Sequence, residues 1–164
     1  MSRRWALALA AGLAAGCGNP GIMSPAPDFE ARTLTGQALR LSSLRGKVVL
    51  LDFWATWCEP CEETIPRLEA LDAEYRGKGL AVVGLSVDDD DAEVQPYVRE
   101  HGMRYPVVVD ADKRVMALYG VRGIPVTVLV DRAGLVRRRW LGSGDGIGDE
   151  VEAAVKKLVL EAKL

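Results

Sequence analysis

Two long apolar runs dominate the hydrophobic pattern of the chain. Residues Val48–Trp54 and Leu80–Val87 are apolar almost without interruption, and continuous runs of this length are typical of strands buried on both faces of a sheet. Shorter runs predict further strands at Pro106–Val109, Val126–Val130 and Leu135–Leu141, the last two joined by a tight turn. A largely buried central sheet is therefore expected.

Apolar residues recur at helical spacing in segments between and after these strands. The periodicity predicts helices over Glu59–Arg76, Ala92–Glu100, Lys113–Tyr119 and Asp149–Leu160. The glycine-rich segment Gly142–Gly148, which precedes the last helix, is expected to be a loop.

A pair of shorter strands is predicted before the first long apolar run. These strands, Phe29–Leu34 and Ala38–Leu41, are expected at an edge of the sheet. The order of strands and helices calls for an α/β fold in which a mixed sheet is covered by helices on both faces. A length of 164 residues suits one such domain.

The first sixteen residues have the features of a secretory signal peptide. Arg3 and Arg4 precede the apolar run Trp5–Ala15, which falls short of the roughly 20 residues that span a bilayer as a helix. Positive charge, a short apolar stretch and small residues before a break are typical of an export signal. A buried N-terminal helix is the alternative, and the break at Gly18–Gly21 disfavours it. We therefore expect residues 1–16 to be removed on export.

Residues Leu13–Cys17 resemble a bacterial lipobox, in which cleavage precedes a cysteine that then carries lipid. The match departs from that pattern at Ala14, where Leu, Val or Ile is usual. On this interpretation Cys17 anchors the protein to a bacterial membrane, facing the periplasm. Residues 17–27 then form a flexible tether and residues 28–164 the folded domain. Cleavage by an ordinary signal peptidase would instead give a soluble periplasmic protein.

Composition narrows the class of protein. Apolar residues make up 49% of the chain and charged residues 27%, which argues against a disordered protein. The formal net charge of −2 gives no attraction to a polyanion, so no nucleic-acid partner is expected. A four-ligand zinc site would need all three cysteines and His101 together. No metal is expected.

The cysteine pair in Cys58-Glu59-Pro60-Cys61 directly follows the first long strand and begins the predicted helix after it. At a helix N-terminus, unpaired backbone N–H groups and the helix dipole stabilise a thiolate, and Pro60 suits the first helical turn. The two intervening residues let the sulfurs form a reversible disulfide. Half of a zinc site and a purely structural disulfide are the alternatives. The first lacks a second cysteine pair, and the second closes a loop too short to stabilise the fold much.

The segment Leu51–Cys61 resembles the active-site sequence of thioredoxins. It is more similar still to exported TlpA/ResA-type thiol:disulfide oxidoreductases of the thioredoxin-like (redoxin/AhpC-TSA) superfamily. Further matching motifs extend the resemblance over most of residues 27–160: Pro27–Phe29, Leu44–Lys47, Tyr119–Pro125 and Asp131…Gly134. The resemblance implies a thioredoxin-like fold with an N-terminal β extension and a central insertion at about residues 88–104.

The resemblance also assigns roles to three residues. Cys58, the more N-terminal cysteine, is expected to attack a substrate disulfide, and Cys61 to resolve the mixed disulfide. Asp52 lies within an apolar strand, where an unpaired carboxylate is costly, and the matching aspartate of thioredoxins is the general base for the second cysteine. Pairing of Asp52 with a lysine or arginine is the alternative.

Five neighbouring residues are expected to shape the site. Trp57, Glu59 and Pro60 flank the cysteines, and the resemblance implies a cis peptide bond between Ile124 and Pro125 packed against the disulfide. The negative charge of Glu59 beside the nucleophile opposes the helix dipole and disfavours the thiolate. This favours a reductant over a strong oxidant.

The function implied by the resemblance is disulfide exchange with exported proteins, in the direction of reduction. Members of this family often reduce apocytochrome c thiols before haem attachment and receive electrons from a membrane thiol transporter; no cofactor is implied, and we expect a monomer. One alternative is a peroxiredoxin-like thiol peroxidase, although Leu51 and Ala55 stand where its proline and hydroxyl residue would be. Another is a non-enzymatic lipoprotein binding module with a structural disulfide.

Four consecutive aspartates, Asp88–Asp91, follow the second long strand. They lack the alternation and the glycine of a calcium-binding loop. A solvated loop that caps the next helix is therefore expected.

Overall fold

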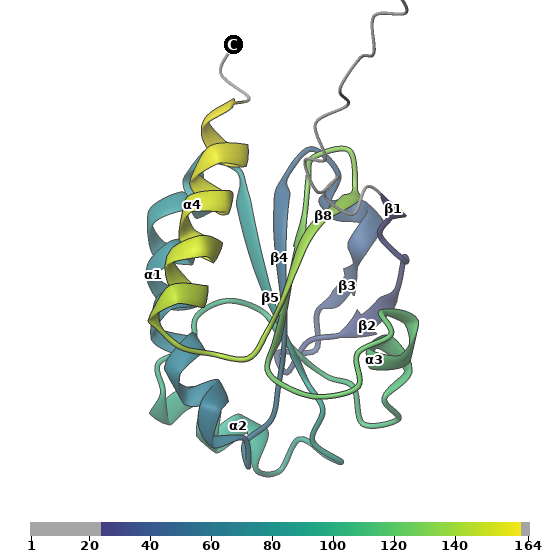
Figure 1. Cartoon of the computed structure of the whole chain (residues 1–164). Coiled ribbons are helices and arrows are strands. Elements are labelled where there is room, and N and C mark those ends of the chain that lie inside the picture. The colour runs from purple at the N-terminus through teal and green to yellow at the C-terminus, as the bar shows by residue number, and fades with distance from the viewer. Residues whose placement is uncertain (1–23, 162–164) are drawn as a thin grey trace, which may run out of the picture.

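A six-stranded mixed sheet forms the centre of the computed structural model, which describes residues 24–161 (Figure 1). The predictions for residues 1–16 and for Cys17 lie outside this range. The sheet is ordered β1-β8-β7-β4-β5-β6. Its strands are β1 (Ser24–Pro25), β4 (Val48–Trp54), β5 (Leu80–Ser86), β6 (Val107–Val109), β7 (Val126–Val130) and β8 (Leu135–Leu141).

Helices and a small second sheet cover the two faces of this sheet. The second sheet consists of β2 (Glu30–Arg32) and β3 (Ala38–Arg40). The α-helices are α1 (Thr64–Tyr75), α2 (Val94–Glu100), α3 (Arg114–Leu118) and α4 (Asp145–Glu161). Three short 3₁₀ helices are η1 (Leu41–Leu44), η2 (Glu59–Glu63) and η3 (Arg76–Lys78). Helices α1, α2 and α4 lie on one face, and β2, β3 and α3 on the other (Figure 1).

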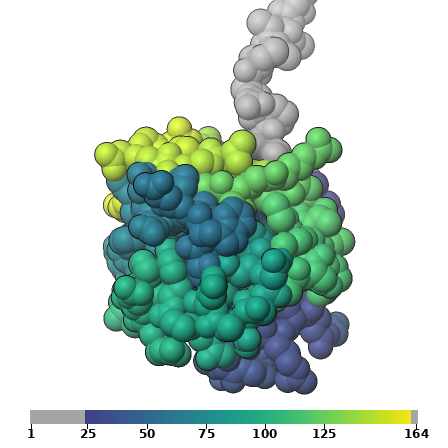
Figure 2. Space-filling model, turned by 90° about the horizontal axis from the view of Figure 1, so that it is seen from below, coloured from purple at the N-terminus to yellow at the C-terminus, as the bar shows by residue number. Residues whose placement is uncertain are grey.

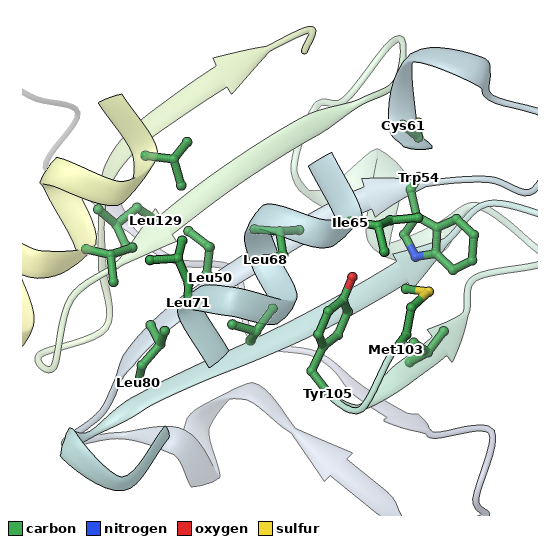
Figure 3. Packing of buried hydrophobic residues seen from close by; sticks show 14 of the residues in the cluster. Leu50, Trp54, Cys61, Ile65, Leu68, Leu71, Leu80, Met103, Tyr105 and Leu129 are labelled. Carbon is green, nitrogen blue, oxygen red and sulfur yellow. The ribbon is translucent and has the colours of Figure 1, made fainter. Parts of the chain in front are cut away.

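Strand β4 lies at the centre because all seven of its residues are buried. It pairs in parallel with β5 and antiparallel with β7. Its alternate side chains supply two hydrophobic cores, with Leu50 and Trp54 facing α1 and Leu51 and Phe53 facing the opposite layer. Figure 3 shows the first core, in which Trp54 and Ile65 lie beneath Cys61. The predicted mixed sheet flanked by helices is confirmed.

The N-terminal strand pair differs from the prediction of two strands at an edge of the main sheet. Strands β2 and β3 form a sheet of their own, joined to β6 by a single bridge between Thr33 and Val108. The edge beyond β8 is instead occupied by the unpredicted strand β1, in which Pro25 pairs with Leu135, and Ala26 is buried. The ordered fold therefore includes residues 24–27, which the sequence assigns to the tether.

Two helices also begin or divide differently from the prediction. The segment predicted as one helix from Glu59 starts as the 3₁₀ turn η2 and becomes α-helical at Thr64. Helix α4 begins at Asp145, inside the segment predicted to be a loop. Arg67 of α1 forms ion pairs with Asp145 and Asp149, which anchors this glycine-rich first turn. No helix within residues 24–161 is long and apolar enough to cross a membrane.

Candidate active site

The Cys58–Cys61 pair forms a disulfide at the end of β4. The sulfur atoms are 2.06 Å apart and the Cα atoms 5.3 Å apart. A tight turn leads from β4 into η2. In this turn the Cys58 N–H donates to the Ala55 carbonyl at 3.2 Å, and in η2 the Cys61 N–H donates to the Cys58 carbonyl at 3.0 Å. Cys58 is the N-cap residue of η2 and Pro60 lies in its first turn. The backbone thus directs the start of the helix toward the disulfide.

The two cysteines are enclosed while their neighbours are open to solvent. Cys58 is 5% exposed and Cys61 is fully buried. Trp57 is 68% exposed, and Glu59 and Pro60 are also exposed. A partner can therefore reach the site over Trp57, and the Cys58 sulfur is the more accessible of the two.

The loop before β7 meets the same end of the sheet. The Ile124–Pro125 peptide bond is cis, and Pro125 is buried. Because β7 is antiparallel to β4, with Val126 opposite Phe53, this loop enters the sheet beside the turn that carries the disulfide. Figure 2 shows this end of the molecule. The segment after β4 lies there beside the segments near residues 85–110 and 120–145.

Asp52 is a fully buried carboxyl two residues before the end of β4. Its Oδ1 accepts a hydrogen bond from the Thr127 hydroxyl at 3.2 Å, and its Oδ2 is buried without a partner. No lysine or arginine within residues 24–161 forms an ion pair with it. Burial, only partly offset by the Thr127 hydrogen bond, raises the pKa of Asp52 to about 7. This carboxyl can therefore take up or release a proton near neutral pH.

The strand beside Asp52 helps to exclude water from its carboxyl. Gly84 of β5 stands opposite Asp52, and a Cβ atom at Gly84 would lie 3.0 Å from Trp54 Nε1 and 3.2 Å from Tyr105 Cε2. Large aromatic side chains thus pack directly on the backbone at this position. Both belong to the core beneath Cys61 (Figure 3), which explains the strong desolvation of the neighbouring carboxyl.

A groove of about 420 Å³ lies between α1 and the start of α4. Its lining includes Thr64, whose hydroxyl donates to the Cys61 carbonyl at 2.8 Å, and Thr127, which donates to Asp52. Two residues that line the groove are therefore hydrogen-bonded to Cys61 and to Asp52. Within residues 24–161 there is no cluster of three His, Cys, Asp or Glu side chains that could hold a metal ion.

Asp88 is a site residue that the sequence analysis missed. The acidic segment was expected to be solvated, but Asp88 is only 6% exposed, and that expectation was wrong for this residue. Its carboxylate accepts hydrogen bonds from the Thr56 hydroxyl at 2.7 Å and from the Ser86 hydroxyl at 2.6 Å. Thr56 lies two residues before Cys58. A run of four aspartates gives no sequence signal that distinguishes the buried member from the exposed ones.

This arrangement is suited to two-electron exchange between thiols and disulfides. A cysteine pair that can close on itself, a helix start aimed at it, and a buried carboxyl of raised pKa in the strand that leads to the pair are suited to such chemistry. Solved structures support this conclusion. A thiol:disulfide interchange protein DsbE from Chlorobium tepidum superposes with a TM-score of 0.80 at 31% identity, covering 84% of this chain and 96% of that one. A secreted disulfide oxidoreductase of Mycobacterium tuberculosis, homologous to E. coli DsbE, superposes with a TM-score of 0.71 at 27% identity, covering 79% and 96%.

Fold and site together define a thiol:disulfide oxidoreductase with a thioredoxin-like fold, as the sequence predicted. The model of the AhpC/TSA family matches residues 22–139. ResA, a thiol-disulfide oxidoreductase of Bacillus thuringiensis, is 34% identical over 137 residues, covering 84% of this chain and 78% of that protein. ResA of Geobacillus thermodenitrificans is 36% identical over 122 residues, covering 74% and 70%. The chain belongs to the AhpC/TSA family, among its ResA-type thiol-disulfide oxidoreductases.

Proposed function

We propose that this protein reduces disulfides of exported proteins by cycling Cys58 and Cys61 between dithiol and disulfide. The observation that carries the proposal is the Cys58–Cys61 disulfide at the end of β4, with a proton-exchanging carboxyl, Asp52, buried in the same strand. A structural disulfide has no use for a carboxyl that titrates near neutral pH, whereas a redox pair must gain and lose protons as it cycles.

The chemistry follows from the positions of the three residues. The Cys58 thiolate attacks one sulfur of the substrate disulfide, and the other substrate sulfur leaves as a thiolate. Asp52 accepts the proton of Cys61, whose thiolate then attacks the Cys58 sulfur and releases the substrate as a dithiol. Two electrons pass to the substrate, and the Cys58–Cys61 disulfide is left to be reduced by a donor.

The direction of exchange is supported by the charges around the nucleophile. Glu59 and Glu62 lie in the first turn of η2, where a negative charge opposes the helix dipole and disfavours a thiolate. A dithiol that is poorly stabilised gives up its electrons readily, so reduction of substrates is favoured over their oxidation.

The cellular setting of this proposal rests on the N-terminal sequence. We infer that residues 1–16 direct export, that Cys17 carries the lipid, and that a short tether holds the domain at the periplasmic face of a membrane. The secreted relative from M. tuberculosis is compatible with export. Proteins with disulfides near a membrane, such as apocytochrome c, are then the natural substrates, and a membrane thiol transporter is the natural donor.

The deciding measurement is the redox potential of the cysteine pair. The full chain carrying Cys17→Ser, which leaves only Cys58 and Cys61 as thiols, is equilibrated with glutathione buffers and the oxidised fraction is measured. We expect a potential near about −270 mV, as in thioredoxin. A value near about −120 mV would assign an oxidant, and one below about −300 mV a structural disulfide.

Two further experiments test the roles and the anchor. Cys61→Ser should trap substrates as mixed disulfides on Cys58, whereas the matched Cys58→Ser variant should trap none. Capture by neither variant would contradict the proposal.

Labelled fatty acid should enter the wild-type chain and not the Cys17→Ser variant. Unlabelled wild-type protein recovered from the periplasm would assign a soluble form.

A further inference from the structure

We propose that Asp88 is a positioning residue of the redox site, which fixes the turn before Cys58 and disfavours its thiolate. The Thr56 N–H donates to both carboxylate oxygens, at 3.1 and 3.3 Å, and the Thr56 hydroxyl donates to Oδ1 at 2.7 Å. Both donors of Thr56 are therefore held by one buried carboxylate. Asp88 thus binds the turn directly, although it lies 32 residues after Thr56 in the chain.

The segment that follows β5 contacts the chain at two points, just before the turn and within it. The Val87 N–H donates to the Trp54 carbonyl at 2.8 Å, just before the turn, and Asp88 binds Thr56 within it. The Cys58 N–H then donates to the Ala55 carbonyl. The path of the chain from β4 to the nucleophile is thus set by the end of β5 as well as by η2.

A lysine holds the Asp88 loop from its other side. The Lys113 ammonium donates to the main-chain carbonyl of Asp88 at 3.2 Å and to the Asp89 carboxylate at 2.9 Å. Lys113 has φ = 56°, a left-handed conformation that is costly for a residue with a side chain and that persists where its surroundings impose it. The loop is therefore held between Thr56 and Lys113.

The Asp88 carboxylate is held on the turn that leads to Cys58 by hydrogen bonds from uncharged groups. Lys113 contacts its backbone and not its side chain, and no lysine or arginine in the part of the chain that the structure describes forms an ion pair with this carboxylate. Asp88 is hydrogen-bonded to Thr56, two residues before Cys58. A unit charge about 12 Å from a thiol, at an effective dielectric constant of about 20, shifts the ionisation equilibrium of the thiol by about tenfold. The other acidic groups around the nucleophile are Asp52 in β4, Glu59, Glu62 and Glu63 in η2, and Asp89.

A second buried aspartate provides a matched control. Asp110 directly follows β6, is 4% exposed, and accepts hydrogen bonds from the N–H groups of Val115 and Met116 at 2.9 and 2.7 Å. Its carboxylate supports α3 and makes no hydrogen bond to the active-site turn. Substitution of Asp110 therefore reports the cost of losing a buried carboxylate without disturbing Thr56.

The experiment compares Asp88→Asn, Asp88→Ala and Asp110→Asn in the full chain carrying Cys17→Ser. Each variant is equilibrated with glutathione, and the reduced protein is alkylated with iodoacetamide across a range of pH, with the label at Cys58 quantified by mass spectrometry. At a pH above the thiol pKa of both proteins, we expect the equilibrium of Asp88→Asn to lie about tenfold further toward the dithiol than that of the wild type, or about 30 mV. Alkylation at pH 6 should be about threefold faster, because a more acidic thiol is more ionised but less nucleophilic. Asp110→Asn should change neither quantity.

Substitution of the partner residue separates the tether from the charge. Thr56→Val removes the hydroxyl donor and keeps the Asp88 charge, whereas Thr56→Ser keeps both donors. We expect Thr56→Val to broaden the proton resonances of the turn, as seen by NMR, with Thr56→Ser resembling the wild type. These variants and Asp88→Asn also test the inference if Asp88→Ala does not fold.

The inference rests on the proposed redox role of Cys58 and Cys61, and the two can fail separately. A wild-type potential outside the range of a reductant would overturn the proposed function alone. A folded Asp88→Asn protein with wild-type potential and alkylation profile would overturn the role of Asp88. Equal shifts in Asp88→Asn and Asp110→Asn would also overturn it, because the effect would then be common to any buried carboxylate.

Discussion

Two buried aspartates, Asp52 within β4 and Asp88 just after the neighbouring strand β5, have opposite surroundings. Asp52 within β4 has a single donor, Thr127, and an oxygen without a partner. Asp88, just after β5, has donors on both oxygens, from Thr56 and Ser86. Both carboxyls are buried, so the number of hydrogen-bond donors, and not the degree of burial, distinguishes their surroundings.

The position of each residue relative to its strand explains the difference. Asp52 pairs with Gly84 on one side and Thr127 on the other, so the backbone N–H groups around it are used in the sheet and cannot reach its side chain. Asp88 lies beyond the last paired residue of β5, where the free N–H and hydroxyl of Thr56 turn toward it. A shift of two residues past the end of a strand thus changes the role of a carboxyl.

Removal of the Asp52 carboxyl should produce the largest effect. The folded protein keeps the Asp52 proton up to about pH 7, whereas the unfolded chain releases it near pH 4. The free energy of unfolding therefore falls as pH rises from about 4 to 7, and the penalty is complete above 7. Asp52→Asn should be more stable than wild type at pH 8 by up to about 4 kcal/mol. Urea unfolding of the two oxidised proteins from pH 4 to pH 8 measures this difference in the free energy of unfolding. A difference that does not widen with pH would contradict the prediction.

Removal of the Asp88 carboxyl should act in the opposite direction. Asp88→Ala leaves the N–H and hydroxyl of Thr56 and the hydroxyl of Ser86 without their acceptor, at a cost of about 2–3 kcal/mol. The same urea titration at pH 7 measures the loss. Asp88→Asn, which keeps one acceptor, should lose less. A gain in the stability of Asp88→Ala would contradict this prediction, because the buried carboxyl of Asp88 would then destabilise the fold as that of Asp52 does.

The kinetic effect of Asp52 should be of intermediate size. Without a proton acceptor for Cys61, Asp52→Asn should release substrate from the mixed disulfide more slowly at pH 8, by roughly one to two powers of ten. Stopped-flow measurement of the second step, with a fluorescent disulfide substrate, gives the rate. The first step, attack by Cys58, should be little changed and serves as the internal control.

The smallest effect concerns the single donor to Asp52. Thr127→Val keeps the shape of the side chain and removes the hydroxyl that lowers the pKa of Asp52. The pKa should therefore rise above 7, by up to about one unit, equivalent to the usual strength of one hydrogen bond. Titration of the Asp52 carboxyl by NMR measures this shift. A fall in the pKa would show that the hydroxyl donates elsewhere.

The strongest features of the sequence predicted the fold well. Two continuous apolar runs predict β4 and β5, because short runs rich in β-branched residues are typical of strands buried on both faces. The cysteine pair was predicted from its place between strand and helix. The peptide bond before Pro125, which the family resemblance implied to be cis, is cis in the structure.

The features that the sequence did not reveal depend on contacts between distant parts of the chain. Strand β1 has two residues and no periodicity, and exists because β8 offers it an edge. The first turn of α4 contains Gly146 and Gly148, which local propensity assigns to a loop. Arg67 lies across Gly148, where a Cβ would be 2.6 Å from its side chain, so glycine at this position allows the two helices to be joined.

Strand β1 determines at which end of the central sheet the chain enters the folded domain. Pro25 pairs with Leu135 at the beginning of β8, and the register of β8, β7 and β4 places that end of the sheet at Val48–Val49, opposite the disulfide. The seven residues of β4 separate the two ends by about 20 Å. The chain therefore enters the domain at one end and carries out its chemistry at the other (Figure 1). The point of entry at Ser24 and the Cys58–Cys61 disulfide are thus separated by the length of the sheet.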